Sequence, residues 1–212
     1  MIIKRKNGGE AIIDYKYTFM EAYRVKKANL FWIIIDKLAY RINDLAKLYE
    51  KTVGNEYRKE REKFVLSKAK KILHIGCGSY PLTAMILAEM DGVNIVTIDS
   101  SSRAVKLANK VISKKKLNGK IKAEQGDGTK YPLDEFDTII ISGCSVPKIK
   151  VLEHVFKDAK PQSRIILRDS FLDMDSIIKN SNPHQNIKIV EKMENHLFPD
   201  STWNSFYLVK ND

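Results

Sequence analysis

The chain has 212 residues and a mass of 24.3 kDa, enough for one domain with a small additional region but not for two domains of ordinary size. Hydrophobic residues make up 43% and charged residues 30%, so the composition indicates a folded protein and excludes a disordered one. The formal net charge of +11 favours anionic partners, such as nucleic acid, an acidic lipid surface, or a carboxylate or phosphate metabolite.

Sequence features argue against a membrane-spanning or secreted protein. The longest apolar run, Leu30–Ile35, is far shorter than the roughly 20 residues that span a bilayer. The first residues, Met1–Lys6, lack the apolar stretch and cleavage site of a secretory signal. Cys77 and Cys144 can form one disulfide at most, and a reducing cytoplasm is the simpler interpretation. We therefore expect a cytoplasmic protein with no membrane partner.

The positive charge is concentrated in the first third of the chain. Residues 1–70 hold 17 Lys and Arg against 9 Asp and Glu, whereas residues 71–212 hold 20 against 17. The basic residues are interspersed with acids, as in Arg58–Lys63, which predicts a solvated helix with ion pairs rather than a basic stripe. Nucleic-acid binding, with or without RNA modification, is therefore an alternative that the sequence does not favour.

Residues 1–70 predict a β-hairpin followed by helices. The segment Ile2–Tyr15 has two β-like runs around Asn7-Gly8-Gly9, a sequence that suits a tight hairpin turn. From residue 18 to residue 70 there is no proline, and apolar residues recur at helical spacing. Two or three helices are expected there, with a break near Gly54. We assign residues 1–70 as a substrate lid or interaction region.

Residues 71–212 alternate short apolar strands with amphipathic helices. The expected strands are 72–75, 93–98, 121–124, 138–141, 165–167, 187–193 and 203–209, and the expected helices are 82–90, 102–115, 148–158 and 172–180. This alternation predicts an α/β fold with a doubly wound, mostly parallel, seven-stranded Rossmann-like sheet. The last two strands, joined by 196–200, predict an antiparallel C-terminal hairpin. Such a sheet is typical of S-adenosylmethionine-dependent methyltransferases rather than of dinucleotide dehydrogenases.

Four polar or glycine-rich segments follow consecutive predicted strands, and in open α/β sheets ligands bind at those strand ends. Asp99 ends the second strand of this domain, where its carboxylate can accept hydrogen bonds from both ribose hydroxyls. Asp127 lies in a glycine turn, where it can accept from an adenine amino group. We expect S-adenosylmethionine as the cofactor. The expected binding residues are Gly76, Cys77, Gly78, Pro81, Leu82, Thr83, Asp99, Ser100, Gly126, Asp127, Gly128, Ser142 and Gly143.

Other interpretations of these segments differ in the ligand. A nicotinamide dinucleotide is disfavoured because Pro81 stands where the dinucleotide fingerprint has glycine or alanine. Asp99 or Asp127 alone would be an ordinary turn or helix-cap residue, and only their ordered combination with the glycines indicates a cofactor. A non-catalytic regulator that keeps the cofactor fold is a further alternative.

The histidines and cysteines do not predict a metal site. His74 lies inside a predicted strand, where a packed core histidine is expected. Cys77 and Cys144 lack a Cys-x-x-Cys companion and are expected to be small structural residues near the site. No i, i+4 ligand spacing occurs among the remaining histidines, which are His154, His184 and His196.

Several segments between residues 72 and 210 match a pattern that is known from one family. They are Gly78–Thr83 with the sequence GSYPLT, Val146–Lys148 before a predicted helix, Arg164–Arg168, Leu197–Pro199 and Ser205–Lys210. Together they resemble the methyltransferase-like domain of the nicotianamine synthase family, especially its archaeal members. Pro-Leu-Thr directly after the glycine turn is the most distinctive part of this resemblance.

The resemblance implies transfer of the 3-amino-3-carboxypropyl group of S-adenosylmethionine rather than of its methyl group. It also implies an N-terminal helical region that supplies a glutamate and tyrosines over the substrate. That glutamate does not align here, so Glu50, Glu56 and Tyr57 are catalytic candidates by position. Independently, Lys148 and Arg168 follow predicted strands at the sheet edge, and we expect them to bind a carboxylate or phosphate of the substrate.

The sequence as a whole predicts an S-adenosylmethionine-dependent transferase. Methyl transfer to a small anionic metabolite is the default reaction, and aminocarboxypropyl transfer is the alternative. The loop Ser142–Pro147 lacks the Asn/Asp-Pro-Pro-Tyr sequence of enzymes that methylate adenine or glutamine amino groups, which disfavours those substrates.

Overall fold

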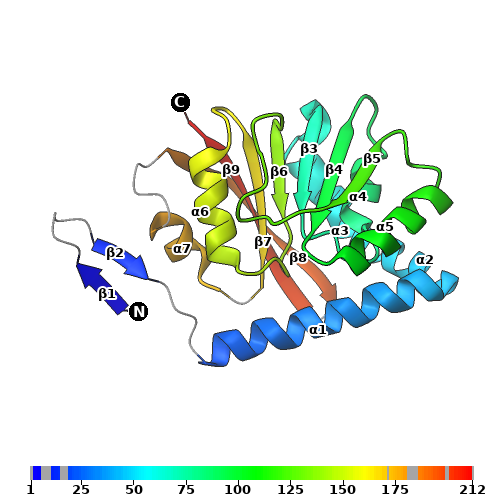
Figure 1. The fold of residues 1–212 in the computed structure, drawn as a ribbon, viewed down its shortest axis with the longest axis horizontal. Coiled ribbons are helices and arrows are strands. Elements are labelled where there is room, and N and C mark those ends of the chain that lie inside the picture. Colours follow the sequence, from blue (N-terminus) through cyan, green and yellow to red (C-terminus); the bar gives the residue numbers. More distant parts are fainter. Residues whose placement is uncertain are drawn as a thin grey trace.

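A seven-stranded sheet forms the centre of the protein, with strand order β5-β4-β3-β6-β7-β9-β8 (Figure 1). The computed structural model describes residues 2–5, 11–14, 19–170, 172–180, 186–198 and 201–211. Strands β3 to β7 are parallel, and β9 is antiparallel to both β7 and β8, which confirms the predicted fold class. The bounds are β3 Lys71–Ile75, β4 Asn94–Asp99, β5 Ile121–Gln125, β6 Thr138–Ile141, β7 Arg164–Asp169, β8 Ile187–Phe198 and β9 Ser201–Lys210.

Both faces of the three central parallel strands are buried, since β6 is buried at every position and β3 and β7 at every position after the first. Ile139, Ile140 and Ile141 of β6 are each fully buried. Ile140 packs in the cluster that includes helices α4 (Leu82–Leu87) and α5 (Ser102–Lys114). Ile139 and Ile141 pack in the opposite cluster, with α6 (Lys148–Asp158) and α7 (Met174–Asn180). The helices therefore cover the sheet on two faces.

The N-terminal region contains the predicted hairpin and three helices. Strands β1 (Ile2–Arg5) and β2 (Ala11–Asp14) pair antiparallel, which confirms the hairpin. The helices are α1 (Phe19–Arg41), α2 (Asn43–Lys51) and α3 (Val53–Lys63), followed by the short 3₁₀ turn η1 (Leu66–Lys68).

The expected helix break near Gly54 is confirmed, because α2 ends at Lys51 and α3 begins at Val53. The chain breaks at Ile42, which has an extended backbone, and again at Thr52. Gly54 lies inside α3, where a Cβ would come within 3.2 Å of the Ile86 side chain. The glycine therefore serves close packing of α3 against α4 and does not end a helix.

The C-terminal hairpin is longer than the sequence analysis indicates. The segment 196–200 was expected to connect the last two strands, but His196 pairs with Thr202 and Phe198 with Ser201. The β8–β9 ladder thus continues almost to its tip.

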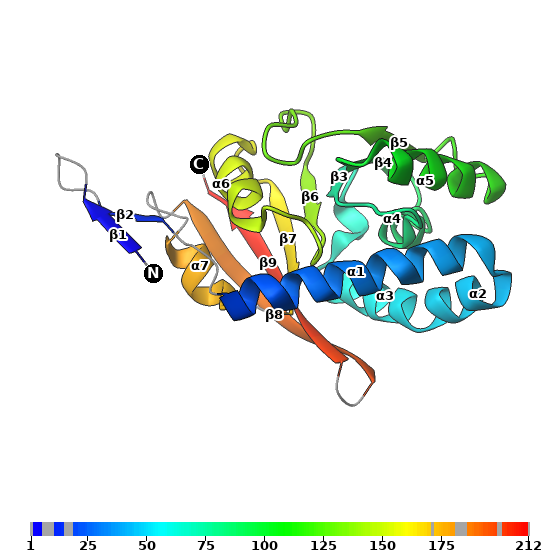
Figure 2. The ribbon, with the colours of Figure 1, turned by 60° about the horizontal axis from the view of Figure 1, so that its bottom comes forward.

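Helix α1 crosses the carboxyl ends of the parallel strands (Figure 1), and α2 and α3 lie side by side with it (Figure 2). Trp32, Ile35 and Ala39 pack α1 onto the core cluster. None of the described helices has the length and apolar character needed to cross a membrane.

Candidate active site

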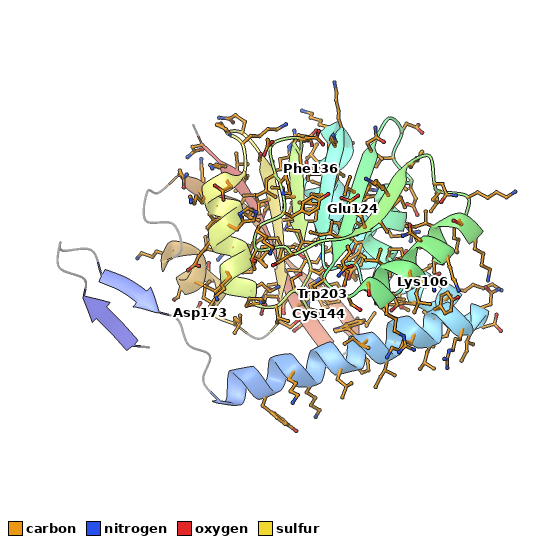
Figure 3. All side chains as sticks on the ribbon, viewed as in Figure 1. Lys106, Glu124, Phe136, Cys144, Asp173 and Trp203 are labelled. Carbon is orange, nitrogen blue, oxygen red and sulfur yellow. The ribbon has the colours of Figure 1, made fainter. Side chains whose placement is uncertain are left out.

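A cavity of about 900 Å³ lies between the carboxyl ends of the parallel strands and the helices α1, α2 and α3. Its volume is in the upper part of the roughly 300–1,000 Å³ range of small-molecule sites. Figure 3 shows Cys144 and Trp203, two of its lining residues, between the sheet and α1. The position agrees with the rule that open α/β sheets bind ligands at these strand ends.

Almost all of the predicted cofactor residues line this cavity. The exception is Pro81, which caps α4 and lies outside the cavity lining. The predicted residues that line the cavity are Gly76, Cys77, Gly78, Leu82, Thr83, Asp99, Ser100, Gly126, Asp127, Gly128, Ser142 and Gly143. They follow β3, β4, β5 and β6, so four chain segments that are distant in sequence meet in one place.

The glycine turn after β3 has a backbone that other residues rarely adopt. Gly76 and Gly78 have φ values of +87° and +66°, in the left-handed region that glycine tolerates best. A Cβ on Gly76 would lie 2.6 Å from the Ser145 hydroxyl oxygen, and a Cβ on Gly78 would lie 2.0 Å from a carboxylate oxygen of Asp36. The two glycines therefore allow the Ser145 hydroxyl and the Asp36 carboxylate to approach the backbone closely, which any other residue would prevent.

The glycine turn also fixes Asp99. The Gly78 N–H donates to Asp99 Oδ2 at 3.0 Å, and the Ser101 N–H donates to Asp99 Oδ1 at 2.9 Å. These bonds hold both carboxylate oxygens in one orientation at the wall of the cavity, where their remaining lone pairs can accept from a diol.

Asp127 is held as an ionised acceptor at the exposed edge of the cavity. Both the N–H and the hydroxyl of Thr129 donate to Asp127 Oδ1, at 2.9 and 2.8 Å. These hydrogen bonds lower the pKa of Asp127, because they stabilise the charged form.

Asp36 of α1 is a cavity residue that the sequence analysis missed. It is 9% exposed, and its Oδ2 accepts from the Ser79 N–H at 3.1 Å. The Tyr49 hydroxyl donates to Oδ1 at 3.5 Å. Burial raises the pKa of Asp36 to about 7, against the opposing effect of these hydrogen bonds. The available signal was an acid directly after the apolar run Leu30–Ile35, on the face that Ala39 also buries.

Two tyrosines from the helices accompany Asp36 in the cavity wall. Tyr49 of α2 is buried and Tyr57 of α3 is half-buried, and desolvation raises the pKa of both phenols above the usual value. Both therefore remain protonated at neutral pH and can donate hydrogen bonds. Tyr57 is one of the three candidates chosen by position, and the structure places it in the cavity.

The other two candidates chosen by position lie outside the cavity lining. Glu50 Oε1 accepts from the Tyr80 hydroxyl at 2.5 Å and from Lys115 Nζ at 2.6 Å. Glu56 is buried and pairs with Lys59 at 2.6 Å. Glu50 thus joins α2 to Tyr80 and to Lys115 at the end of α5, whereas the Glu56 pair lies within α3.

The expected substrate cation Arg168 is engaged inside the protein. Its guanidinium donates to both carboxylate oxygens of Glu60 and, at 2.7 Å, to the Thr83 hydroxyl. The same group lies 3.8 Å from the ring centre of Tyr57. Arg168 lines the cavity, but Glu60 neutralises its charge, and both side chains are less than 5% exposed.

The other expected substrate cation, Lys148, does not line the cavity. Its ammonium donates to the carbonyl oxygens of Ser142 and Arg168, at 2.6 and 2.9 Å, and lies 3.6 Å from Asp169. Because the side chain is 2% exposed, Lys148 fixes the loops after β6 and β7 rather than facing a ligand.

His74 is a buried histidine in the floor of the cavity. Its ring nitrogens lie 2.9 Å from the Thr97 hydroxyl and 2.8 Å from the Ser142 hydroxyl. Burial lowers its pKa to about 3, so the ring is neutral. The two cysteines also line the cavity, and burial raises the pKa of Cys77 and Cys144 to about 12, which keeps both as thiols.

The remaining histidines lie elsewhere. His154 contacts Asp158 on α6, and His196 is exposed on β8. His184 lies outside the described residues. Within the described ranges, no group of three His, Cys, Asp or Glu side chains is placed to hold a metal ion.

The comparisons with known proteins agree with this geometry. A family model described as a methyltransferase domain matches residues 66–208. Among curated proteins there is no match. A point mutant of the nicotianamine synthase MtNAS, solved with S-adenosylmethionine, is 16% identical with a TM-score of 0.67, and the match covers 91% of this chain and 76% of that chain.

Two further solved structures share the fold across a smaller part of the chain. The [4+2]-cyclase SpnF is 12% identical with a TM-score of 0.60, covering 73% of this chain and 80% of its own. A structure described as a sarcosine dimethylglycine methyltransferase from Galdieria sulphuraria is 13% identical with a TM-score of 0.57, covering 74% and 84%. At these identities the likeness shows the fold, which hosts more than one chemistry.

The cavity has features that fit S-adenosylmethionine. The glycine turn brings backbone without side chains to the cavity wall, and the carboxylates of Asp99 and Asp127 offer acceptors from two neighbouring strands. The family model and the neighbours crystallised with this molecule support it as the cofactor. Since the family model matches more than half of the chain, the protein belongs to the methyltransferase domain family.

Proposed function

We propose that the protein is an S-adenosylmethionine-dependent transferase that moves the 3-amino-3-carboxypropyl group to a nucleophilic acceptor. The observation that carries this proposal is the extent of the likeness to MtNAS. It covers 91% of this chain, against 73–74% for SpnF and the Galdieria protein. A match of that length includes helices that close the cavity, and these helices, rather than the shared sheet, are what selects the acceptor and the reacting carbon.

In this proposal the predicted cofactor residues hold S-adenosylmethionine. The carboxylate of Asp99 accepts from the ribose hydroxyls and that of Asp127 from the adenine amino group, with Gly76 and Gly78 giving close backbone approach. When bound, the cofactor supplies a sulfonium that activates each of its three neighbouring carbons toward a nucleophile. The group transferred therefore depends on which carbon the surrounding protein leaves open to the acceptor.

Asp36 is the proposed general base. Its pKa of about 7 allows a large fraction of the carboxylate to be ionised at neutral pH while it can still take up a proton. The Tyr49 hydroxyl and the Ser79 N–H orient it at the cavity wall. In this role Asp36 accepts the proton that an amine acceptor loses as its nitrogen attacks carbon. The helix α1 supplies the acid here, in place of Glu50 or Glu56.

Methyl transfer, the default expectation from the sequence, is the second candidate. It is favoured by the description of the family model and by the likeness to the Galdieria methyltransferase. The same cofactor residues would serve both reactions, and the acceptor in both would be a small molecule that fits the closed cavity.

The nucleoside product separates the two reactions. Breaking the bond from sulfur to the aminocarboxypropyl carbon leaves methylthioadenosine, whereas breaking the bond to the methyl carbon leaves S-adenosylhomocysteine. The purified protein is incubated with S-adenosylmethionine and the small-molecule fraction of a cell extract, and the nucleosides are quantified by mass spectrometry. We expect methylthioadenosine above a control without enzyme, which corrects for spontaneous decay of the cofactor. S-adenosylhomocysteine as the product would contradict the proposal in favour of methyl transfer.

A further inference from the structure

The outer face of α1 exposes large apolar side chains that no described residue covers. Among the described residues, eight of the eleven exposed large hydrophobic side chains lie between residues 23 and 48. Six of them lie on α1, namely Tyr23, Leu30, Phe31, Ile33, Ile34 and Leu38, and the other two, Ile42 and Leu48, follow it. Leu30 is 58% exposed and Phe31 is 54% exposed, although burying such a side chain is worth roughly 1.5–3 kcal/mol. A concentration of this kind marks an interaction surface.

Cations lie among these apolar side chains rather than around them. Lys27, Leu30, Ile34, Leu38 and Arg41 follow one another at steps of three or four residues, so they share one face of the helix. Neither cation forms an ion pair with a described residue.

Among the side chains of α1 that the structure describes, this face carries more positive charge and no compensating acid. Lys26 and Lys37 are also exposed. Asp36, the acid of α1 whose side chain is described, is buried toward the cavity. We call the exposed surface of residues 23–41 the α1 outer face; it combines aliphatic and aromatic side chains with long basic ones.

The charge pattern decides against a second copy of this chain as the occupant. A twofold interface would place Lys27 and Arg41 of both copies inside the contact, where charged groups are depleted and like charges are costly. The N-terminal hairpin is not the occupant either, because β1 and β2 lie beyond the start of α1 in both views (Figures 1 and 2).

An anionic lipid surface would accommodate both the apolar and the basic side chains of the α1 outer face. Aliphatic and aromatic side chains on one helix face enter the boundary between headgroups and acyl chains, while lysine and arginine side chains extend to the lipid phosphates. Each basic residue near such a surface strengthens binding through the negative surface potential. Helix α1 runs along the lower edge of the molecule in Figure 1, where a flat bilayer could approach it.

We propose that the α1 outer face docks the protein in the plane of an anionic membrane surface. The proposal departs from the expectation that the protein has no membrane partner, since α1 lies on the bilayer and does not cross it. Lys27, Phe31, Ile33 and Lys37 are exposed on α1 and also line the cavity. Docking through α1 therefore brings the cavity to the headgroup layer.

The test is vesicle flotation of the full chain at low and at high salt. The vesicles contain equal parts of phosphatidylglycerol and phosphatidylcholine, with pure phosphatidylcholine as the neutral reference. We expect the protein to float with the anionic vesicles at low salt, to bind less at high salt, and to bind the neutral vesicles more weakly.

Two double variants separate the apolar from the electrostatic contribution. The ridge variant, Leu30→Gln with Ile34→Gln, replaces two apolar side chains of the α1 outer face. The charge variant, Lys26→Glu with Arg41→Glu, reverses two charges outside the cavity lining. The charge variant should bind anionic vesicles about 30-fold more weakly or worse. Its matched control is Lys106→Glu with Lys110→Glu on α5, which changes the net charge equally from another surface (Figure 3). The control should bind within a few-fold of the wild-type protein.

Several results would overturn the proposal. They are the absence of binding to anionic vesicles at low salt, an equal loss in the control variant, and full binding by Leu30→Gln/Ile34→Gln. A stable dimer by light scattering that becomes monomeric in Leu30→Gln/Ile34→Gln, with no vesicle binding, would assign the face to a second copy instead. Circular dichroism melting curves check that every variant folds; if the ridge variant does not, the charge pair alone decides.

Discussion

The buried position of Asp36 suits its proposed role as a general base, but it lowers the stability of the fold when the carboxyl is ionised. Its carboxyl is buried between α1 and the glycine turn, and burial is the main cause that raises its pKa to about 7. A group that is shifted in this way by desolvation is typical of functional sites, where stability is lost for reactivity.

The free energy of unfolding should therefore depend on pH through the titration of Asp36. The Asp36 carboxyl has an ordinary value of 3.8 when exposed and about 7 in the fold, so the folded state binds this proton more tightly. The stabilisation by the protonated form is complete below pH 4 and is lost as the pH rises to about 7, a difference of roughly 4 kcal/mol. Asp36→Asn removes this titration. The free energy of unfolding, measured with urea, should be higher for the variant than for the wild-type protein at pH 8, and this advantage should vanish near pH 4.

The same substitution should damage the proposed transfer. Loss of a general base costs about 100- to 10,000-fold in rate, and the wild-type rate should rise between pH 6 and pH 8 as Asp36 ionises. Asp44→Asn, an exposed acid on α2, is the control for stability and for rate. If Asp36→Asn keeps both the rate and its pH profile, Asp36 is not the base.

Asp99 offers a separate test of the cofactor site. Asp99→Asn removes the charge that strengthens hydrogen bonds from the ribose hydroxyls, so S-adenosylmethionine should bind about 10- to 100-fold more weakly by calorimetry. The fully exposed Asp91 gives the control Asp91→Asn, which should bind like the wild-type protein. Equal affinity of the Asp99 variant would contradict the assigned ribose contact.

Single residues also show which parts of the candidate site could be predicted from the sequence and which could not. Asp99 was predictable because it follows a strand at a fixed distance from the glycine turn. Asp36 was not, because its partner Ser79 lies 43 positions away, and only the packing of α1 brings the two together. Lys148 and Arg168 were placed near the correct strand ends, but the sequence could not show that Asp169 and Glu60 already engage them.

At the scale of elements, one buried ion pair ties α3 to the sheet. Glu60 of α3 accepts from Arg168 of β7 and, at 2.5 Å, from the Ser205 hydroxyl of β9. Arg168 in turn lies over the ring of Tyr57. This cluster places the cavity residue Tyr57 and joins three elements that are far apart in the sequence.

Removing one partner should therefore be costly. Glu60→Ala leaves Arg168 buried without its counter-ion, so we expect a loss of about 3–5 kcal/mol in the free energy of unfolding. Glu62→Ala removes an exposed acid from the same helix and should change it by less than about 0.5 kcal/mol. Equal urea midpoints for the two variants would show that the ion pair does not hold α3 in place.

Strands were easier to predict than helix ends. The parallel strands contain short apolar or β-branched runs bounded by polar turns, so their positions follow from local sequence. The helix breaks at Ile42 and Thr52 do not fall on a glycine or proline that would mark them in the sequence. Gly54 lies inside α3 and packs against Ile86, and this role depends on tertiary structure that the sequence does not reveal.

For the whole molecule, the sheet supplies the cofactor residues and the N-terminal helices close the cavity over them. The assignment of residues 1–70 as a lid or interaction region stays a prediction. The sequence did not predict how the N-terminal helices sit, because the position of α1 across the strand ends depends on contacts such as those of Trp32 and Ala39 with the core. A small part of the positive charge, Lys26, Lys27, Lys37 and Arg41, lies on the α1 outer face, and its position there depends on how the helix packs against the sheet.

The central claim is that this cavity binds S-adenosylmethionine. Isothermal titration calorimetry of the wild-type protein with S-adenosylmethionine, S-adenosylhomocysteine and NAD tests it directly. We expect one molecule of either adenosyl ligand to bind per chain, with no measurable heat from NAD, because Pro81 and the acid-lined cavity suit the sulfonium cofactor rather than a dinucleotide. Tight binding of NAD without binding of S-adenosylmethionine would contradict the account.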